Sequence, residues 1–225
     1  MKILIVEDDK DICEILEFNL ANEGYDVTCA HSAEEGLKLL QENHALILLD
    51  VMMGGMSGYK MAEQLRKEQN HTPIIFLTAK DTENDMLTGF SVGGDDYISK
   101  PFSIKEVIAR VKAHTKRSGK NFPDTNQYLH IGDLMIDFDL KEVQIESEKI
   151  ALTKTEFEIL SLLAQNPNRV FSRDRIIETV WGDTIYITER TVDVHITRLR
   201  KKLGDYREII TNRPGYGYRF DATKL

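Results

Sequence analysis

The apolar run from Leu46 to Leu49 constrains the fold more than any other stretch, because its four consecutive residues offer solvent no polar face. Uninterrupted apolar runs are typical of strands in a parallel sheet that helices cover on both faces. The run ends at Asp50 and continues into the glycine-containing segment 51–58. Ligands of such sheets bind just beyond the carboxyl ends of the strands, so Asp50 stands where a reactive group is expected.

Strand-like apolar runs alternate with segments of helical periodicity through the first half of the chain. This alternation predicts a doubly wound, five-stranded parallel sheet of the α/β class, for which the strand order 2-1-3-4-5 is one common solution. In that order the first and third strands are neighbours, so Glu7, Asp8 and Asp50 should meet at one edge, with Thr78 and Lys100 opposite. The predicted strands are 3–6, 25–30, 46–49, 73–77 and 97–98, and the first predicted helices are 10–23, 33–43 and the segment after Gly58.

Three carboxylates at one edge of a sheet repel one another, so a cation is expected beside them. Close carboxylates raise one another's pKa, and a hard divalent ion with oxygen ligands, Mg²⁺ above all, offsets this repulsion. A carboxylate beside Mg²⁺, with the Lys100 amine and the Thr78 hydroxyl near, suits phosphoryl transfer onto the carboxylate itself. The residues alone leave open a calcium-type site, or a solvated acidic edge with Lys100 in a structural salt bridge.

Four motifs, in order and at matching intervals, resemble the receiver domain of two-component response regulators: Glu7-Asp8, Leu49-Asp50, Leu77-Thr78-Ala79 and the segment 95–102, DDYISKPF. The resemblance implies a flavodoxin-like fold in which Asp50 accepts phosphate from a sensor histidine kinase. The only chemistry it implies is self-phosphotransfer and self-dephosphorylation at Asp50.

The same resemblance gives roles to other residues. It implies that Glu7, Asp8, Asp50 and the Met52 carbonyl bind Mg²⁺. It implies that Lys100 contacts the phosphoryl group before a cis Pro101, and that Thr78 and Tyr97 move on phosphorylation. It also implies a homodimer on activation, with expected contacts from Asp95, Asp96, Glu106, Arg110 and Lys112.

The second half of the chain has a different organisation. Residues 118–127 contain many turn formers and predict a linker between domains 1–117 and 128–225. Short strand-like pieces follow, and Thr153 and Glu156 then form a Thr-x-x-Glu capping box at the start of a helix. Ser172 is expected to cap a second helix, so this half is predicted to be a small α+β domain.

A third predicted helix, 188–203, has the chemistry of a DNA-reading element. Val192, Ile196, Leu199 and Leu203 recur at three- and four-residue steps and define its buried side. Arginine and threonine suit phosphates and base edges, and an exposed valine can contact a thymine methyl. The opposite face carries Arg190, Val194, Thr197, Arg198 and Lys201, with Arg200 on the flank. A generic cationic surface helix is the alternative.

The segments after and around this helix decide between the two interpretations. A predicted hairpin from Glu208 to Phe220 would make a winged helix-turn-helix, and segments 152–157 and 190–196 resemble the effector domain of OmpR/PhoB-type regulators. The resemblance implies binding of double-stranded DNA at direct-repeat half-sites, with RNA polymerase as a further partner. The implied DNA contacts are Arg190, Thr191, Val194, Thr197, Arg198 and Arg200 from the helix and Thr211 and Arg213 from the wing.

Composition is consistent with a soluble, two-domain regulator. The chain has 225 residues and a net charge of −8, yet residues 190–219 hold eight basic and three acidic residues. No apolar run is long enough for a membrane span, and the acidic start does not fit a signal peptide, so a cytoplasmic location is expected. Cys13 and Cys29 are expected to be reduced packing residues.

Two other functions compete with a phosphorylation-controlled regulator. A phosphatase of the haloacid dehalogenase type would also form an aspartyl phosphate, but it needs Asp-x-Asp, and Met52 stands at the second position. A regulator that binds DNA independently of phosphate, with its first half as a dimerisation module, stays open.

Overall fold

The computed structural model describes residues 1–40, 44–79, 83–115, 128–182 and 187–224, except for the side chains of 83–87. The chain divides into two compact units, Met1–Ser118 and Gly119–Leu225. The predicted linker at 118–127 lies outside the described residues. Among the described helices, none has the length and apolar character needed to cross a bilayer.

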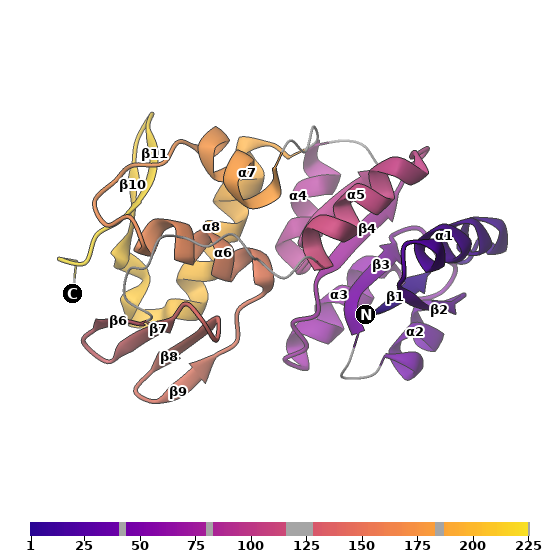
Figure 1. Ribbon diagram of the computed structural model, residues 1–225, viewed down its shortest axis with the longest axis horizontal. Coiled ribbons are helices and arrows are strands. Elements are labelled where there is room, and N and C mark those ends of the chain that lie inside the picture. The colour runs from indigo at the N-terminus through magenta and orange to yellow at the C-terminus, as the bar shows by residue number, and fades with distance from the viewer. Residues whose placement is uncertain (41–43, 80–82, 116–127, 183–186, 225) are drawn as a thin grey trace. The chain divides into compact units, whose positions relative to one another are not determined.

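The first unit is built on a five-stranded sheet with the order β2-β1-β3-β4-β5, and every neighbouring pair is parallel, which confirms the predicted fold and strand order. The apolar residues of β1 and β4 and the run Leu46 to Leu49 of β3 are fully buried because helices cover both faces of the sheet (Figure 1). The strands are β1 (Lys2–Val6), β2 (Asp26–Ala30), β3 (His44–Asp50), β4 (Ile74–Thr78) and β5 (Asp96–Ser99).

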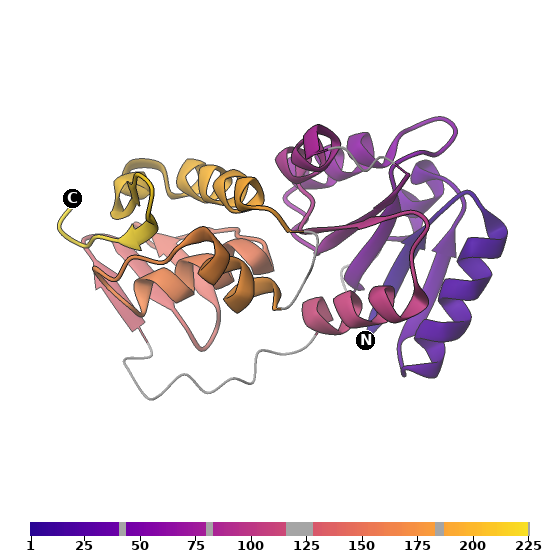
Figure 2. The same ribbon diagram turned by 90° about the horizontal axis from the view of Figure 1, so that it is seen from above.

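Five helices form the outer layers, and Figure 2 shows the sheet between them. Helices α1 and α5 pack on one face, where Leu16 and Val111 join a core with Ile5 and Leu48. Helices α2, α3 and α4 cover the other face. The predicted helix 33–43 is shorter than expected, because Leu40 already has extended backbone angles and 41–43 lie outside the described residues. The bounds are α1 (Lys10–Asn22), α2 (Ala33–Leu39), α3 (Gly58–Lys67), α4 (Glu83–Val92) and α5 (Ile104–Thr115).

The loop after Asp50 folds back tightly onto the end of β3. The amide of Gly58 donates to the carbonyl of Val51 at 3.2 Å, and a Cβ at Gly58 would lie 2.1 Å from the Asp50 carbonyl oxygen. Only glycine permits this approach. Ser57 then caps α3 by accepting a hydrogen bond from the amide of Lys60, which fixes the point where the loop ends and the helix begins.

The second unit combines a four-stranded antiparallel sheet, three helices and a hairpin, as predicted. Thr153 and Glu156 form the predicted capping box and Ser172 caps α7. One boundary is wrong: Glu208 and Ile209 belong to a 3₁₀ helix, η1 (Gly204–Ile209), rather than to the hairpin. The other elements are β6 (Tyr128–Ile131), β7 (Leu134–Asp137), β8 (Glu142–Ile145), β9 (Glu148–Ile150), α6 (Lys154–Ala164), α7 (Arg173–Trp181), α8 (Glu189–Leu203), β10 (Ile210–Arg213) and β11 (Gly217–Phe220).

Candidate functional site

Three carboxylates lie together where β1 and β3 end. Oxygen atoms of Glu7, Asp8 and Asp50 all lie within 4.8 Å of one another. They meet because β1 and β3 are neighbours, with Val6 opposite Leu49 in the register. Glu7 and Asp50 are buried, whereas Asp8 is exposed and opens the cluster to solvent. The predicted meeting of these side chains is confirmed.

Lys100 joins the two buried acids. Its Nζ lies 2.7 Å from Glu7 Oε2 and 2.9 Å from Asp50 Oδ2. Burial would lower the pKa of Lys100, but its hydrogen bonds to Glu7 and Asp50 outweigh burial and raise that pKa. Burial raises the pKa of Glu7 to about 7, Lys100 opposes the rise and the charge of Asp50 adds to it. The single ammonium of Lys100 therefore does not balance the negative charge of the three carboxylates.

The donor set of this cluster fits Mg²⁺. Hard divalent ions prefer carboxylate and carbonyl oxygens, and Mg²⁺ keeps several of its waters, which the exposed Asp8 side permits. The loop after β3 is already tied to the cluster, because the Met52 amide donates to Asp50 Oδ1 at 3.0 Å and the Gly54 amide to Asp8 Oδ2 at 3.4 Å. Ligation by the Met52 carbonyl stays a prediction.

The two predicted switch residues lie on the neighbouring strands β4 and β5. Thr78 is fully buried at the end of β4, and Tyr97 is 2% exposed. Tyr97 points inward and packs edge-on against Phe76, with its hydroxyl 3.5 Å from that of Tyr59. Movement of Thr78 and Tyr97 on phosphorylation stays a prediction. The peptide bond between Lys100 and Pro101 is cis, as predicted.

Three of the predicted dimer residues are buried in contacts within the first unit, and their part in a dimer stays a prediction. Asp95 is fully buried and accepts from Arg66 at 3.0 Å. Asp96 lies 2.7 Å from Arg110 and 3.2 Å from His114, all with side chains at most 8% exposed. Burial raises the pKa of Asp96, but His114 and Arg110 outweigh it and lower that pKa. The partners Arg66 and His114 were not predicted.

The other two predicted dimer residues are more accessible. Glu106 lies 3.1 Å from Arg110 and keeps a side-chain exposure of 25%. Lys112 is half-exposed and lies 2.6 Å from Glu23, the residue that follows α1. A dimer contact through either residue stays a prediction.

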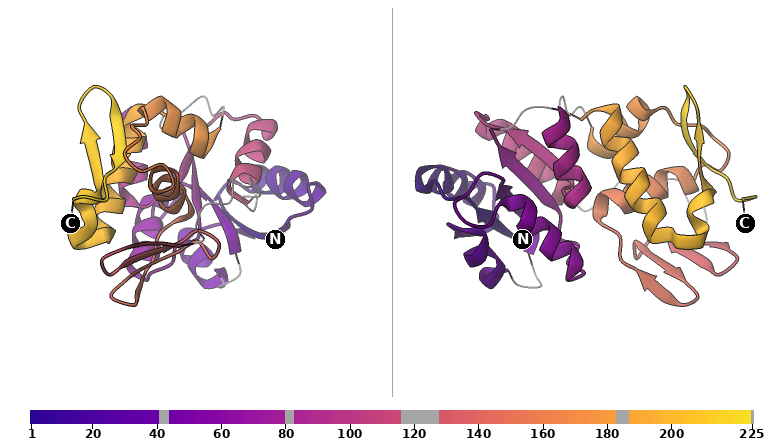
Figure 3. Two further views of the ribbon diagram at one scale, coloured as in Figure 1. Left: turned by 60° about the vertical axis from the view of Figure 1, so that its left-hand side comes forward. Right: turned by 180° about the vertical axis from the view of Figure 1, so that it is seen from behind.

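Helix α8 presents one accessible row of side chains, which we call the groove face: Arg190, Val194, Thr197 and Lys201. These positions follow one another at steps of four, three and four residues, so they lie along one side of the helix. Three of the four are exposed and Val194 is partly buried. Figure 3 shows α8 beside α6 and the β10–β11 hairpin within the second unit.

Three predicted DNA contacts on α8 differ from expectation. Thr191 is 2% exposed, so its side chain belongs to the core, and a DNA contact through it stays a prediction. Arg198 lies 3.1 Å from the fully buried Glu156 of α6. Arg200 donates to the Ile210 carbonyl and lies over the Tyr218 ring. Both arginines therefore have partners within the domain. Lys201, predicted on this face but not among the contacts, is exposed.

The hairpin places two exposed side chains near its tip. Arg213, at the end of β10, and Tyr216, in the turn, are both exposed. Thr211 is half-buried and accepts a hydrogen bond from Arg219 Nε at 3.2 Å. The tip therefore offers the predicted arginine, whereas Thr211 already has a partner on β11.

Comparison with known proteins agrees with both units. Residues 3–112 match the family described as "Response regulator receiver domain", and residues 147–220 match "Transcriptional regulatory protein, C terminal". The response regulator DrrB, a Thermotoga maritima OmpR/PhoB homologue, is 34% identical over 98% of each chain, with a TM-score of 0.52. The chain belongs to the OmpR/PhoB family of response regulators.

Other solved structures support the same assignment for this regulator. A RitR mutant is 29% identical over 97% of this chain and 98% of its own, with a TM-score of 0.72. A Francisella response regulator 1452 receiver domain is 38% identical, covers 52% of this chain and 97% of its own, and has a TM-score of 0.50. The protein is a phosphorylation-dependent transcriptional regulator of a two-component system.

Proposed function

We propose that Asp50 is the residue that takes up phosphate, from the phosphohistidine of a sensor kinase, with Mg²⁺ held by Glu7, Asp8, Asp50 and the Met52 carbonyl. The observation that carries this is the placement of Asp50, buried at the carboxyl edge, 2.9 Å from Lys100 and within the only group of three candidate metal-ligand side chains found in the described residues. Bound Mg²⁺ would supply positive charge to the oxygens of the incoming phosphoryl group.

In the proposed step an Asp50 oxygen forms a bond to phosphorus while the bond from phosphorus to the kinase histidine nitrogen breaks. The imidazole leaves with its electron pair and is protonated. Lys100 holds a phosphoryl oxygen after giving up part of its contact with Glu7, and the Thr78 hydroxyl donates to a second oxygen. Water reverses the modification by attacking the same phosphorus, so both reactions are self-modifications of the regulator.

The test is the intact mass of the protein after incubation with a small phosphodonor, with and without Mg²⁺. We expect one added phosphoryl group that needs Mg²⁺, is labile to hydroxylamine, vanishes in Asp50→Ala and tightens DNA binding. No adduct, with DNA binding undiminished, would contradict the proposal. The remaining interpretation would then be a regulator that binds DNA independently of phosphate, with its first unit as a dimerisation module.

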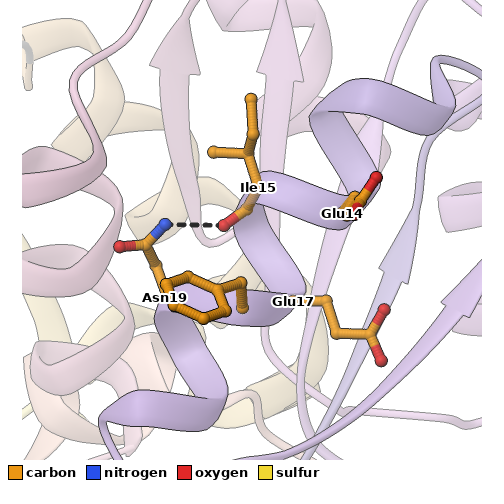
Figure 4. Close-up of a pocket in the computed structure, with 5 residues that line it drawn as sticks. Glu14, Ile15, Glu17 and Asn19 are labelled. Atoms are coloured by element: carbon orange, nitrogen blue, oxygen red, sulfur yellow. Dashed lines mark hydrogen bonds between the residues drawn. The ribbon is translucent and has the colours of Figure 1, made fainter.

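We further propose that α1 contacts the kinase. Its accessible side carries two large apolar residues, Ile15 at 50% and Phe18 at 66% exposure. Together with Glu14, Glu17 and Asn19 they line a pocket, shown in Figure 4. Exposed apolar side chains rimmed by polar ones mark interaction surfaces. Because α1 begins just after Asp8 and Asp9, a partner bound there is within reach of Asp50.

Replacing Phe18 with Ala should slow phosphotransfer from the kinase and leave phosphorylation by a small phosphodonor unchanged. Loss of one buried aromatic anchor commonly costs about 2 kcal/mol or more of binding energy, or roughly 30-fold in kcat/KM. Both rates can be measured by the mass assay. Leu140→Ala, an exposed apolar residue of the second unit, is the control. Equal slowing with both donors would contradict the role of Phe18.

The groove face is proposed to read the major groove, with Val194 and Thr197 towards bases, Arg190 and Lys201 on phosphates, and Arg213 of the wing near the minor groove. The helix face, the basic tip and the family match to a DNA-binding domain support this. Arg198 and Arg200 could reach DNA only by exchanging their present partners. Binding at direct-repeat half-sites, a homodimer on activation, contact with RNA polymerase and a cytoplasmic location stay parts of the proposal.

Replacing Lys201 with Ala should weaken binding about equally to specific and unrelated DNA, because a lysine on a phosphate reads no sequence. The slope of log K against log salt concentration should become shallower by about one. Fluorescence titration at several salt concentrations measures both. Lys149→Ala removes another exposed lysine, at the four-stranded antiparallel sheet, and should change neither. An unchanged slope in Lys201→Ala would remove this residue from the interface.

A further inference from the structure

The carboxylate of Glu34, on α2, contacts the loop after β3. Its Oε1 accepts a hydrogen bond from the Met56 amide at 3.2 Å. The preceding residue passes close to the same group, because a Cβ built at Gly55 would lie 3.4 Å from that Oε1 atom. The side chain therefore meets two consecutive residues of the loop, although 22 positions separate Glu34 from Met56 in the chain.

The helix that carries Glu34 is fixed at its first turn. Ser32 caps α2 by accepting a hydrogen bond from the Glu35 amide at 3.1 Å. A Cβ built at Gly36 would lie 2.9 Å from a methyl carbon of Val6, so α2 packs directly against the end of β1. A helix dipole favours an ionised acid in the first turn. Glu34 is therefore a charged acceptor on a rigid element.

The loop after β3 has hydrogen bonds to two further carboxylates. Asp50 accepts from the Met52 amide at 3.0 Å, and Asp8 accepts from the Gly54 amide at 3.4 Å. Both acids belong to the cluster proposed to bind Mg²⁺, so the metal and the loop amides compete for the same oxygen atoms. Glu34 is not one of the three clustered carboxylates, so its hydrogen bond to the loop can persist when the metal is bound.

We propose that Glu34 is a positioning residue for phosphorylation, which holds the loop after β3 in the conformation that binds Mg²⁺. This inference rests on the function proposed for Asp50. Gly54 and Gly55 are consecutive, and glycine loses more backbone freedom on ordering than any other residue. Because Glu34 orders this backbone before the ion arrives, less conformational entropy opposes binding of the ion through the Met52 carbonyl.

The first measurement is hydrogen exchange of the Met56 amide, followed by NMR in the full-length protein without Mg²⁺. Glu34→Ala should speed this exchange about threefold, a modest effect because the acceptor is exposed to solvent. Glu34→Gln keeps an oxygen acceptor at the same position, so its exchange should be close to that of wild type. Unchanged exchange in Glu34→Ala would overturn the proposal.

The second measurement is Mg²⁺ binding to the unphosphorylated protein by calorimetry. Glu34→Ala should raise the dissociation constant about threefold, because the ion then binds only the fraction of molecules whose loop is ordered. The Mg²⁺ concentration that half-saturates phosphorylation should rise equally, with the rate at saturating Mg²⁺ unchanged. Unshifted Mg²⁺ affinity, or a lower rate at saturating Mg²⁺, would overturn the proposal. Glu63→Ala removes an exposed carboxylate paired with Lys67 and is the control.

A second substitution tests whether Glu34 acts through the loop. The backbone of Gly54 lies outside the left-handed region, and a Cβ built there would have no atom within 4 Å. Alanine at this position restricts the open loop without strain. The double variant Glu34→Ala, Gly54→Ala should therefore bind Mg²⁺ about twofold more tightly than Glu34→Ala alone. Equal affinity of the two variants would overturn the proposed action through loop order.

The exchange and calorimetric measurements use no phosphodonor, so their results are independent of phosphate uptake by Asp50. Wild type that binds Mg²⁺ yet takes up no phosphate would contradict the function proposed for Asp50. The same two measurements would still decide whether Glu34 orders the loop and strengthens Mg²⁺ binding.

Discussion

Replacing Lys100 with Met should slow phosphorylation of Asp50 by about 10²- to 10³-fold, the usual cost of removing one charged or polar donor from a developing anion. Methionine keeps much of the side-chain volume but removes the ammonium that lies between Glu7 and Asp50. The incoming phosphoryl group would lose its cationic contact, and the two acids would lose their counter-charge. The initial rate with a small phosphodonor at saturating Mg²⁺ measures the effect.

Two comparisons make this expectation specific. Lys112→Met removes a lysine that pairs with Glu23 on the outside of the unit, and it should leave the rate almost unchanged, because this pair takes no part in the contacts of Asp50 and a surface pair adds only about 0.5 kcal/mol to stability. In Lys100→Met the pKa of Glu7 should rise above about 7, since Lys100 now lowers it. Phosphorylation of Lys100→Met at the wild-type rate would show that Mg²⁺ alone supplies the charge.

The sheet and the acidic cluster could be predicted because both follow from backbone order. Leu46 to Leu49 have no polar member, so the strand had to be covered on both faces, and parallel order places Asp50 beside Glu7. Lys100 follows β5 directly, so its place at the same edge also follows from the topology. These inferences needed only the direction and order of strands.

The ion pairs of the buried acids could not be predicted, because their partners lie far away in sequence. Arg66, Arg110 and His114 compensate the charges of Asp95 and Asp96 inside the unit. The periodicity of the sequence does not indicate such ion pairs, because they depend on how separate helices and strands are placed relative to one another. Their burial also means that a dimer of this regulator would have to use other surface residues or break these contacts.

Helix α8 shows the same limit of sequence-based prediction for single side chains. A position every 100° places Thr191 near the border between the buried side and the exposed side, and in the structure its side chain is only 2% exposed. Arg198 lies on the basic face, but Glu156 of another helix holds it. The sequence therefore predicts the helix and its polarity, whereas the packing of neighbours decides which of its arginines are available.

Replacing Glu156 with Ala should destabilise the second unit by about 3 kcal/mol, because it removes a fully buried carboxylate and leaves the partly buried cations of Arg198 and Lys202 without their partner. Glu156 is fully buried, lies 3.1 Å from Arg198 and 2.7 Å from Lys202, and completes the capping box by accepting from the Thr153 amide at 2.9 Å. Thermal unfolding of the full chain, with DNA binding as a probe of the second unit, measures the loss. Glu158→Ala, on the same helix, removes a pair with an N···O distance of 3.8 Å and should cost at most about 0.5 kcal/mol.

The effect of Glu156 should depend on pH in a defined direction. Burial raises its pKa, but Arg198 and Lys202 outweigh burial and lower it below the usual value. The unfolded chain therefore takes up a proton at a higher pH than the folded domain. The stability that Glu156 contributes is fully present above its unfolded pKa and is lost as the pH falls through the folded pKa. The difference between wild type and Glu156→Ala should consequently shrink in acid, and a constant difference down to the lowest pH tolerated would show that the cap, rather than the charge pairs, carries the stabilisation.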